Sequence, residues 1–287
     1  MAPDSRTATE KSVLEALEKS GYPLELRVAE CLVKANAGVD QGWHFIDPET
    51  NVLRETDVVG TFAARSEAAA VNVILVAECK SGNQNWVAFR SRESMVSDPS
   101  HLLDLLITKE LGQSERLPAV AKHSQLPVQS TFLEPQSIGY SLANARGKDD
   151  DNQDRAYRAV MAAMSAAQGV CNEFGEVGFP LTIVVIPVVV AAFPLLDGWL
   201  DESGEVQVKE TQVTNVSLRV ARSDGRKRCV VTTLEGLPRV VTMAQKTAEV
   251  LLGGLRHVPD HPVEFADFSV PRESGEMCPE DGLEYDG

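Results

Sequence analysis

Three charged residues in two strand-like runs have the types and spacing to do chemistry. Asp57 lies in a β-rich run over residues 52–62, and Glu78 and Lys80 end the next such run, residues 71–80. Successive side chains of a strand point to opposite faces, so Glu78 and Lys80 share a face. If the two strands are antiparallel neighbours, Asp57 lies beside Glu78. Two such carboxylates can hold a hard divalent cation through oxygen.

A cation at this place would favour attack on a phosphodiester. It would polarise a phosphate oxygen and lower the pKa of a bound water. Lys80 can then orient or deprotonate the attacking water, or stabilise the charge that develops on the phosphoryl group. The backbone carbonyl of Cys79 is a further candidate metal ligand, while the Cys79 side chain is expected to point into the opposite, packed face.

The surrounding sequence predicts the elements that must position these residues. A short helix over residues 9–20 precedes a second one from Pro23 to Ala35, and a turn at Asp47-Pro48 joins two strands in a hairpin. Further along, the patterns predict helices over 101–111, 154–174 and 237–255, a strand buried on both faces over 181–191, and strands over 206–220 and 229–233. The fold class predicted is α/β, with a mixed central sheet flanked by helices.

The two runs that carry the charged residues resemble the split acidic motif of the PD-(D/E)XK (restriction-endonuclease-like) nuclease superfamily. The match is an Asp in LRETDVV, a gap of twenty residues, and Glu-x-Lys in VAECKSG. Thr56 stands where the family often has Pro. The resemblance implies a core of helix, three strands, helix and strand, with additional strands and a C-terminal helix.

The same resemblance extends to the helix that begins at Pro23. In the family a Glu of the first core helix often completes the site, and Glu25 best matches that position, with Glu30 as the alternative. The implied cofactor is Mg²⁺, for which Mn²⁺ substitutes. The implied activity is endonucleolytic hydrolysis of nucleic acid, DNA more than RNA, with a role in bacterial restriction or defence; a homodimer or a partner protein stays open.

Charge and composition support a rival interpretation. The formal net charge is −15, whereas phosphate binding normally draws on Lys and Arg. A catalytically silent binding or regulatory subunit of a larger complex would fit this charge. However, residues 259–287 hold nine acidic residues against Arg272 alone, which leaves a net charge of only −7 on residues 1–258.

Trp86 and Phe89 could stack on a base, but core packing is the better expectation.

The organisation expected is one domain and a tail. Residues 1–258 should form a single restriction-endonuclease-like domain with an insertion at about 90–153, and residues 259–287 an acidic, flexible tail. The five cysteines are scattered without a Cys-x-x-Cys pair, which is typical of a reducing compartment. With no apolar leader at the N-terminus, a cytoplasmic location without membrane association is expected.

Overall fold

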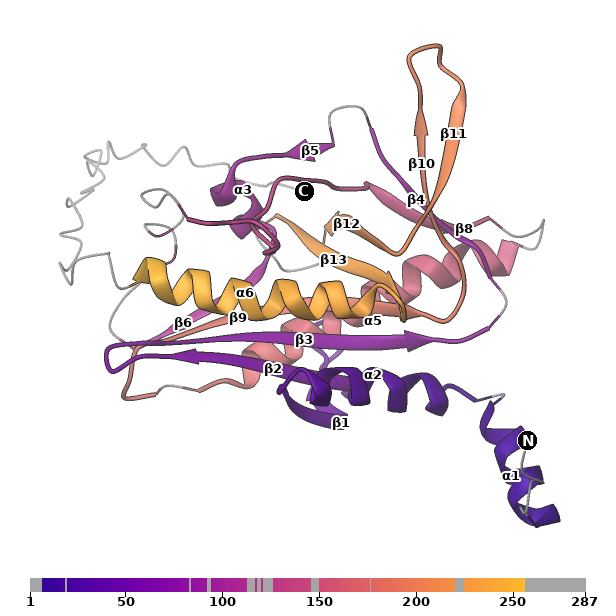
Figure 1. Cartoon of the computed structure of the whole chain (residues 1–287), viewed down its shortest axis with the longest axis horizontal. Helices are drawn as coiled ribbons and strands as arrows, with labels where there is room; N and C mark the ends of the chain where they lie inside the picture. The colour runs from indigo at the N-terminus through magenta and orange to yellow at the C-terminus, as the bar shows by residue number, and fades with distance from the viewer. Residues whose placement is uncertain are drawn as a thin grey trace, which may run out of the picture.

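The structure is a computed structural model, and it has an α/β fold in which helices flank a mixed, largely antiparallel central sheet (Figure 1). It describes residues 7–18, 20–82, 84–91, 94–112, 117, 120, 126–145, 150–175, 177–219 and 225–255. The α/β class and the flanked mixed sheet are therefore confirmed. A second, smaller sheet lies beside the first.

The helices are α1 (Ala8–Glu18), α2 (Tyr22–Lys34), α3 (Pro99–Asp104), α5 (Asp150–Glu173) and α6 (Leu237–Leu255). The central sheet has the order β1 (Gly38–Ile46), β2 (Leu53–Arg65), β3 (Ala70–Lys80), β9 (Leu181–Ala191), β13 (Arg226–Thr233) and β12 (Val213–Arg219), and β6 (Ile107–Leu111) also pairs with β9. The second sheet has the order β11 (Val206–Thr211), β10 (Leu195–Leu200), β4 (Trp86–Phe89) and β8 (Ser141–Asn144), and β5 (Met95–Val96) pairs with β7 (Gln136–Ser137).

Strand β9 lies at the centre of the main sheet because nearly all its residues are apolar and many are β-branched. It pairs in parallel with β3 along its whole length. Its other edge is shared, since β6 pairs with it up to Val185 and β13 pairs with it from Val188 onward. Pro187, which has no N–H to donate, falls in the gap between these two partners.

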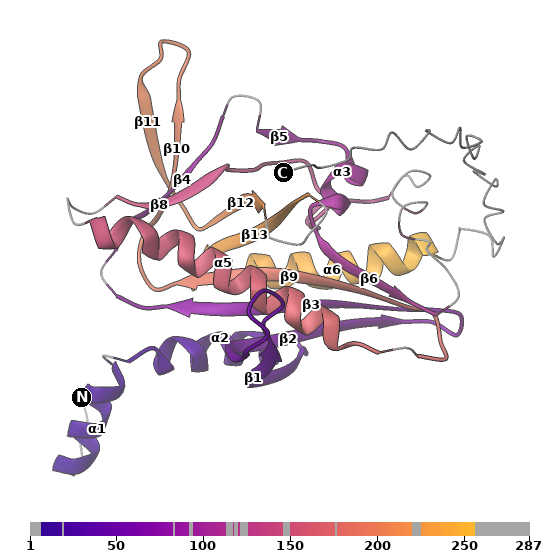
Figure 2. The same ribbon diagram turned by 180° about the vertical axis from the view of Figure 1, so that it is seen from behind.

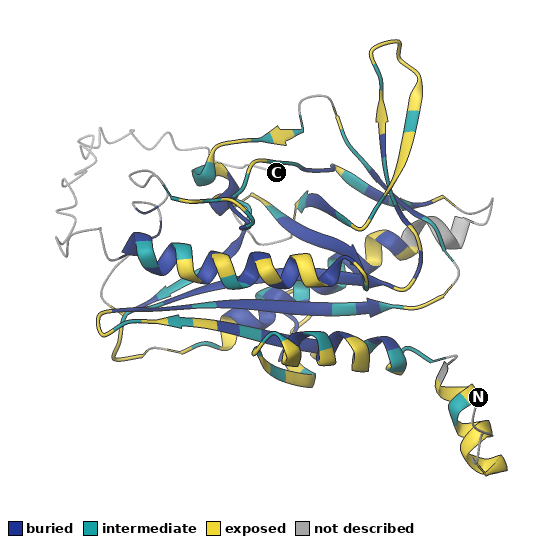
Figure 3. Ribbon diagram, in the orientation of Figure 1, coloured by how far each residue is buried: buried dark blue, intermediate teal, exposed yellow. Residues whose placement is uncertain are grey.

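The two faces of the sheet are covered by different helices. Leu75 and Ala77 of β3 pack in one core cluster with residues of α2 and α6. Ile74 and Val76, which alternate with them, pack instead against α5. Figure 2 shows α5 crossing its face of the sheet, and Figure 3 shows the covered strands as largely buried. The alternation along β3 therefore tells which side each later residue of the strand faces.

Several predicted elements coincide with the structure and two were wrong. The strand over 181–191 and the helix over 237–255 are β9 and α6. The single strand expected over 206–220 is two strands, because the chain crosses at Gln212 from the second sheet to the central one. The helix expected over 101–111 ends early in α3, and the β-branched Ile107 and Thr108 begin β6 on the edge of β9.

The segment 90–153, expected as an insertion, takes part in both sheets where it is described. It supplies β6 to the central sheet and β8 to the second one. Trp86 of β4 is buried in the core, as its packing preference predicted. The predicted tail 259–287 lies outside the described residues. None of the described helices has the length and apolar character needed to cross a membrane.

Candidate functional site

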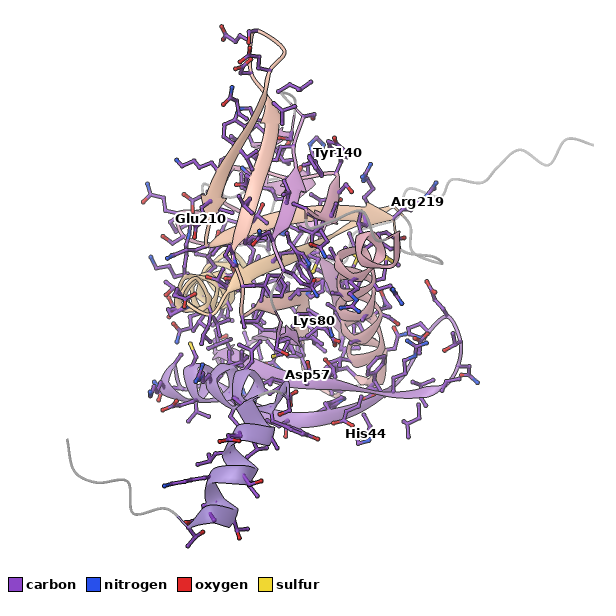
Figure 4. The ribbon with its side chains drawn as sticks, turned by 90° about the vertical axis from the view of Figure 1, so that its right-hand side faces the viewer. His44, Asp57, Lys80, Tyr140, Glu210 and Arg219 are labelled. Carbon is purple, nitrogen blue, oxygen red and sulfur yellow. The ribbon has the colours of Figure 1, made fainter. Side chains whose placement is uncertain are left out.

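The candidate site begins where β2 separates from β3. The two strands pair antiparallel until Val58, which lies opposite Ala77. Asp57 and Glu78 are the next residues on each strand, so they face each other just beyond the last pair. The Cys79 N–H donates to Asp57 Oδ2 at 2.6 Å, so a side chain replaces the main chain as its acceptor. Figure 4 views this end of the molecule, with Asp57 and Lys80 near its centre.

Glu78 and Lys80 form an ion pair on one face of β3. Lys80 Nζ donates to Glu78 Oε1. By the alternation of β3, the two side chains share a face, as the sequence predicted, and it is the face that α5 covers. The Glu78 side chain is 15% exposed and that of Lys80 35% exposed. The pair is thus mostly shielded from water yet still open to a ligand from outside.

Burial makes the two facing carboxyl groups unusually reluctant to ionise. Loss of hydration raises the pKa of Asp57, and neither the Cys79 N–H nor the Lys80 ammonium offsets it. Burial also raises the pKa of Glu78, despite the ion pair with Lys80, and the charge of Asp57 adds to the effect. Since the lysine does not fully compensate these carboxylates, a further positive charge would stabilise them.

Glu25 of α2 belongs to the same electrostatic group. Burial raises its pKa first, and the charges of Asp57, Glu55 and Glu78 raise it further. Glu30, the alternative on this helix, has a different environment. It forms a surface ion pair with Lys34 at 2.7 Å, which lowers its pKa. The structure therefore brings Glu25, and not Glu30, within electrostatic reach of the two strand carboxylates.

Cys79 contributes to the site through its backbone. Its side chain is only 8% exposed and packs in the cluster formed with α2 and α6, on the face opposite Glu78. Burial raises the pKa of the Cys79 thiol, so it remains protonated at neutral pH. Its N–H orients Asp57, while the role of its carbonyl as a metal ligand stays a prediction.

The donors fit a hard divalent cation by their chemistry. They are carboxylate oxygens, which Mg²⁺ prefers as ligands. The single Lys80 ammonium does not fully compensate their negative charge. Their present partners are internal: Asp57 accepts from Cys79, and Glu78 accepts from Lys80. Within the described part of the chain, no three His, Cys, Asp or Glu side chains already converge as a metal-binding group.

Two further features were not foreseen from the sequence. A pocket of about 470 Å³ adjoins the site through Ser81 and is lined by segments that follow β9, β11 and β13. Separately, Arg90 Nη2 and Asp197 Oδ2 form a largely buried ion pair at 2.6 Å, and Thr214 bonds to both side chains. The residues of each feature are far apart in sequence, so no local pattern could have joined them.

Comparison with known proteins gives no relative for this chain: no family model, no curated protein and no solved structure matches it. The candidate site is therefore defined by its own residues, which are Asp57 where β2 leaves β3, Glu78 and Lys80 at the end of β3, the N–H of Cys79, and Glu25 of α2.

Proposed function

We propose that this protein is a metal-dependent nuclease that hydrolyses phosphodiester bonds in nucleic acid. The observation that carries the proposal is the meeting of Asp57 with the Glu78–Lys80 pair at the point where β2 leaves β3. Mg²⁺ is the cation expected, with Mn²⁺ as a substitute. The preference for DNA over RNA, and a role in bacterial restriction or defence, come from the resemblance to PD-(D/E)XK nucleases alone.

The order of elements supports the same proposal. The resemblance implies a core of helix, three strands, helix and strand. The chain presents α2, then β1, β2 and β3, then α5, then β9, with the smaller elements between β3 and α5. In this order the acidic motif falls in the second strand, where it leaves the third, and at the end of the third strand.

The chain's own residues suggest a division of labour. A bound divalent cation would supply a polarised phosphate oxygen and an acidified water. Asp57 and Glu78 would hold it, with Asp57 kept in orientation by the Cys79 N–H. Lys80 would place its ammonium beside the reacting phosphate and stabilise the negative charge that grows there. Glu25, held on a rigid helix, would support the carboxylates from the α2 side.

A second candidate function is a catalytically silent module that keeps this fold for binding or regulation. The observation in its favour is that Asp57 and Glu78 are both satisfied by internal partners, with no third ligating side chain converging on them among the described residues. Against it stands the energetic cost of holding the largely shielded carboxyl groups of Asp57 and Glu78, with Glu25 nearby, around a single lysine. A purely structural site would be more stable with neutral residues there.

Cleavage assays on the purified full-length chain separate the two candidates. Single-stranded and duplex DNA and RNA should be incubated with Mg²⁺, with Mn²⁺ and with EDTA. The nuclease proposal expects cleavage with either metal, none with EDTA, and none by Asp57→Asn or Glu78→Gln. Activity that survives both substitutions would come from a contaminant or another site. If the wild-type chain binds nucleic acid but cuts none of these substrates, the silent module is correct.

A further inference from the structure

The pocket beside the candidate site lies at the carboxyl ends of three parallel strands. Ser81 follows β3, residues 192–194 follow β9, and residues 233–235 begin at the last residue of β13, and all of them line the pocket. Ligands of open α/β sheets are commonly bound at such strand ends. The start of α2 and the crossing segment 210–212 complete the wall. The five segments come from distant parts of the chain and meet only here.

This pocket is joined directly to the residues proposed for catalysis. The N–H of Ala192, in the wall, donates to the carbonyl of Lys80 at 3.0 Å. Leu24, also in the wall, immediately precedes Glu25 on α2. In Figure 4, Glu210 lies above and to the left of Lys80 and Asp57. The pocket therefore adjoins the end of β3, whose Lys80 carbonyl is bonded to its wall and whose next residue, Ser81, lines it.

The wall is preformed and not assembled by flexible side chains. The carbonyl of Gln212 accepts hydrogen bonds from the Thr233 N–H at 2.9 Å and from Thr232 Oγ1 at 2.9 Å. Gly236 packs so closely on this carbonyl that an added Cβ would lie 2.3 Å from its oxygen. The crossing segment is thus fixed against the start of α6, so a ligand would meet a pocket of defined shape.

The lining indicates a neutral ligand with an apolar face and hydrogen-bond donors. Leu24 and Phe193 are buried and give an apolar surface. The charged residues of the lining are one basic residue, Arg27, and two acidic ones, Glu210 and Glu235. The lining therefore has a net negative charge, which disfavours a phosphate. Carboxylates accept hydrogen bonds from amino groups, as they do from the amino group of cytosine. The volume lies within the range of small-molecule sites.

We infer that this pocket receives an unstacked nucleobase of the substrate, from a nucleotide next to the phosphate that is cut, and that it favours bases with an exocyclic amino group. The inference rests on the proposed nuclease function and adds a substrate class to it. A base inside a duplex must first be unpaired and unstacked, at a cost of a few kcal/mol. Single-stranded or unpaired nucleic acid is therefore the preferred substrate.

The test measures base binding without cleavage. Adenosine, cytidine, guanosine and uridine are titrated into the full-length protein in EDTA and followed by ligand-observed NMR. The three amino-bearing nucleosides should bind more tightly than uridine. Ala192→Trp fills the pocket from an exposed position and keeps the backbone hydrogen bond to Lys80. It should weaken the binding of these three nucleosides at least tenfold. Ala68→Trp, at an exposed site in the turn between β2 and β3, is the matched control and should bind as the wild type does.

A second pair of variants guards against a folding defect in the Trp variant. Glu210→Gln with Glu235→Gln should reduce the preference for amino-bearing nucleosides over uridine severalfold, whereas Glu67→Gln, in the same turn as Ala68, should not. The inference is overturned if no nucleoside binds, or if Ala192→Trp binds them like the wild type. Asp57 does not line the pocket, so the Asp57→Asn variant should still bind nucleosides. Failure of cleavage and failure of base binding are therefore separate results.

Discussion

Asp57 Oδ2 accepts the backbone N–H of Cys79 at 2.6 Å, one position beyond the last backbone pair between β2 and β3. A carboxylate that completes a strand ladder is held in one orientation before any ligand arrives. This relationship fixes Asp57 opposite Glu78, and it makes the effect of changing Asp57 unusually easy to interpret.

Asp57→Asn should stabilise the metal-free protein at neutral pH. The amide oxygen of Asn can still accept the Cys79 N–H, while the buried charge is removed. Because burial raises the pKa of Asp57, the protonated carboxyl is favoured in the folded state, and stability is lost as the pH rises through that raised pKa. The gain in Tm should be small at pH 4 and a few degrees at pH 7, measured by thermal unfolding in EDTA. If the Tm difference between Asp57→Asn and the wild type were smaller at pH 7 than at pH 4, the buried charge of Asp57 would not be destabilising.

Divalent metal should reverse that order of stability. A ligand that binds only the folded state at 100 times its Kd contributes about 2.7 kcal/mol. Mn²⁺ should therefore raise the Tm of the wild type by several degrees and leave Asp57→Asn nearly unchanged. The wild type and the Asn variant both contain the acidic residues of 259–287. Metal bound by those residues would therefore raise the Tm of both proteins equally, which makes Asp57→Asn the matched control. Equal shifts in the two proteins would place the bound metal somewhere else.

The two helix carboxylates allow a direct comparison. Glu25→Gln should lower cleavage by roughly 10 to 100-fold, the usual effect of losing a group that supports metal ligands. Glu30→Gln should have no effect on cleavage, because Glu30 lies on the surface and pairs with Lys34. Rates under single-turnover conditions with saturating Mg²⁺ decide between them. If Glu30→Gln is the slower enzyme, the assignment of the helix carboxylate must be exchanged.

The local part of the site was predictable because strand periodicity is a local property. The alternation around Glu78 and Lys80 correctly gave them a common face, and an antiparallel hairpin partner brought Asp57 to them. The choice between Glu25 and Glu30 was not predictable, since both lie on α2 and differ only in what the folded chain places nearby.

The non-local parts of the fold escaped the sequence patterns for a similar reason. Residues 107–111 form a strand because the edge of β9 offers them partners, although their spacing resembles a helix. The break at Gln212 depends on Thr232, Thr233 and Gly236, which pin its carbonyl from more than fifteen residues away. The pocket that results has no signature in any single segment.

The final prediction concerns Lys80, whose ammonium should act on the chemical step. Lys80→Ala should slow cleavage by on the order of 10² to 10³ while changing substrate affinity little, because charge develops on the phosphate mainly in the transition state. Arg should rescue poorly, since its planar guanidinium cannot take the place of a compact ammonium.

Lys80 also has a second, separable effect through its partner. Its charge lowers the pKa of Glu78, so its removal should raise that pKa further and move the onset of cleavage to higher pH. The checks are a pH profile of the single-turnover rate and a binding isotherm for uncleaved substrate in EDTA. A variant that cuts at the native rate would make Lys80 an ordinary strand end. One that loses binding in proportion to rate would make it a simple phosphate clamp.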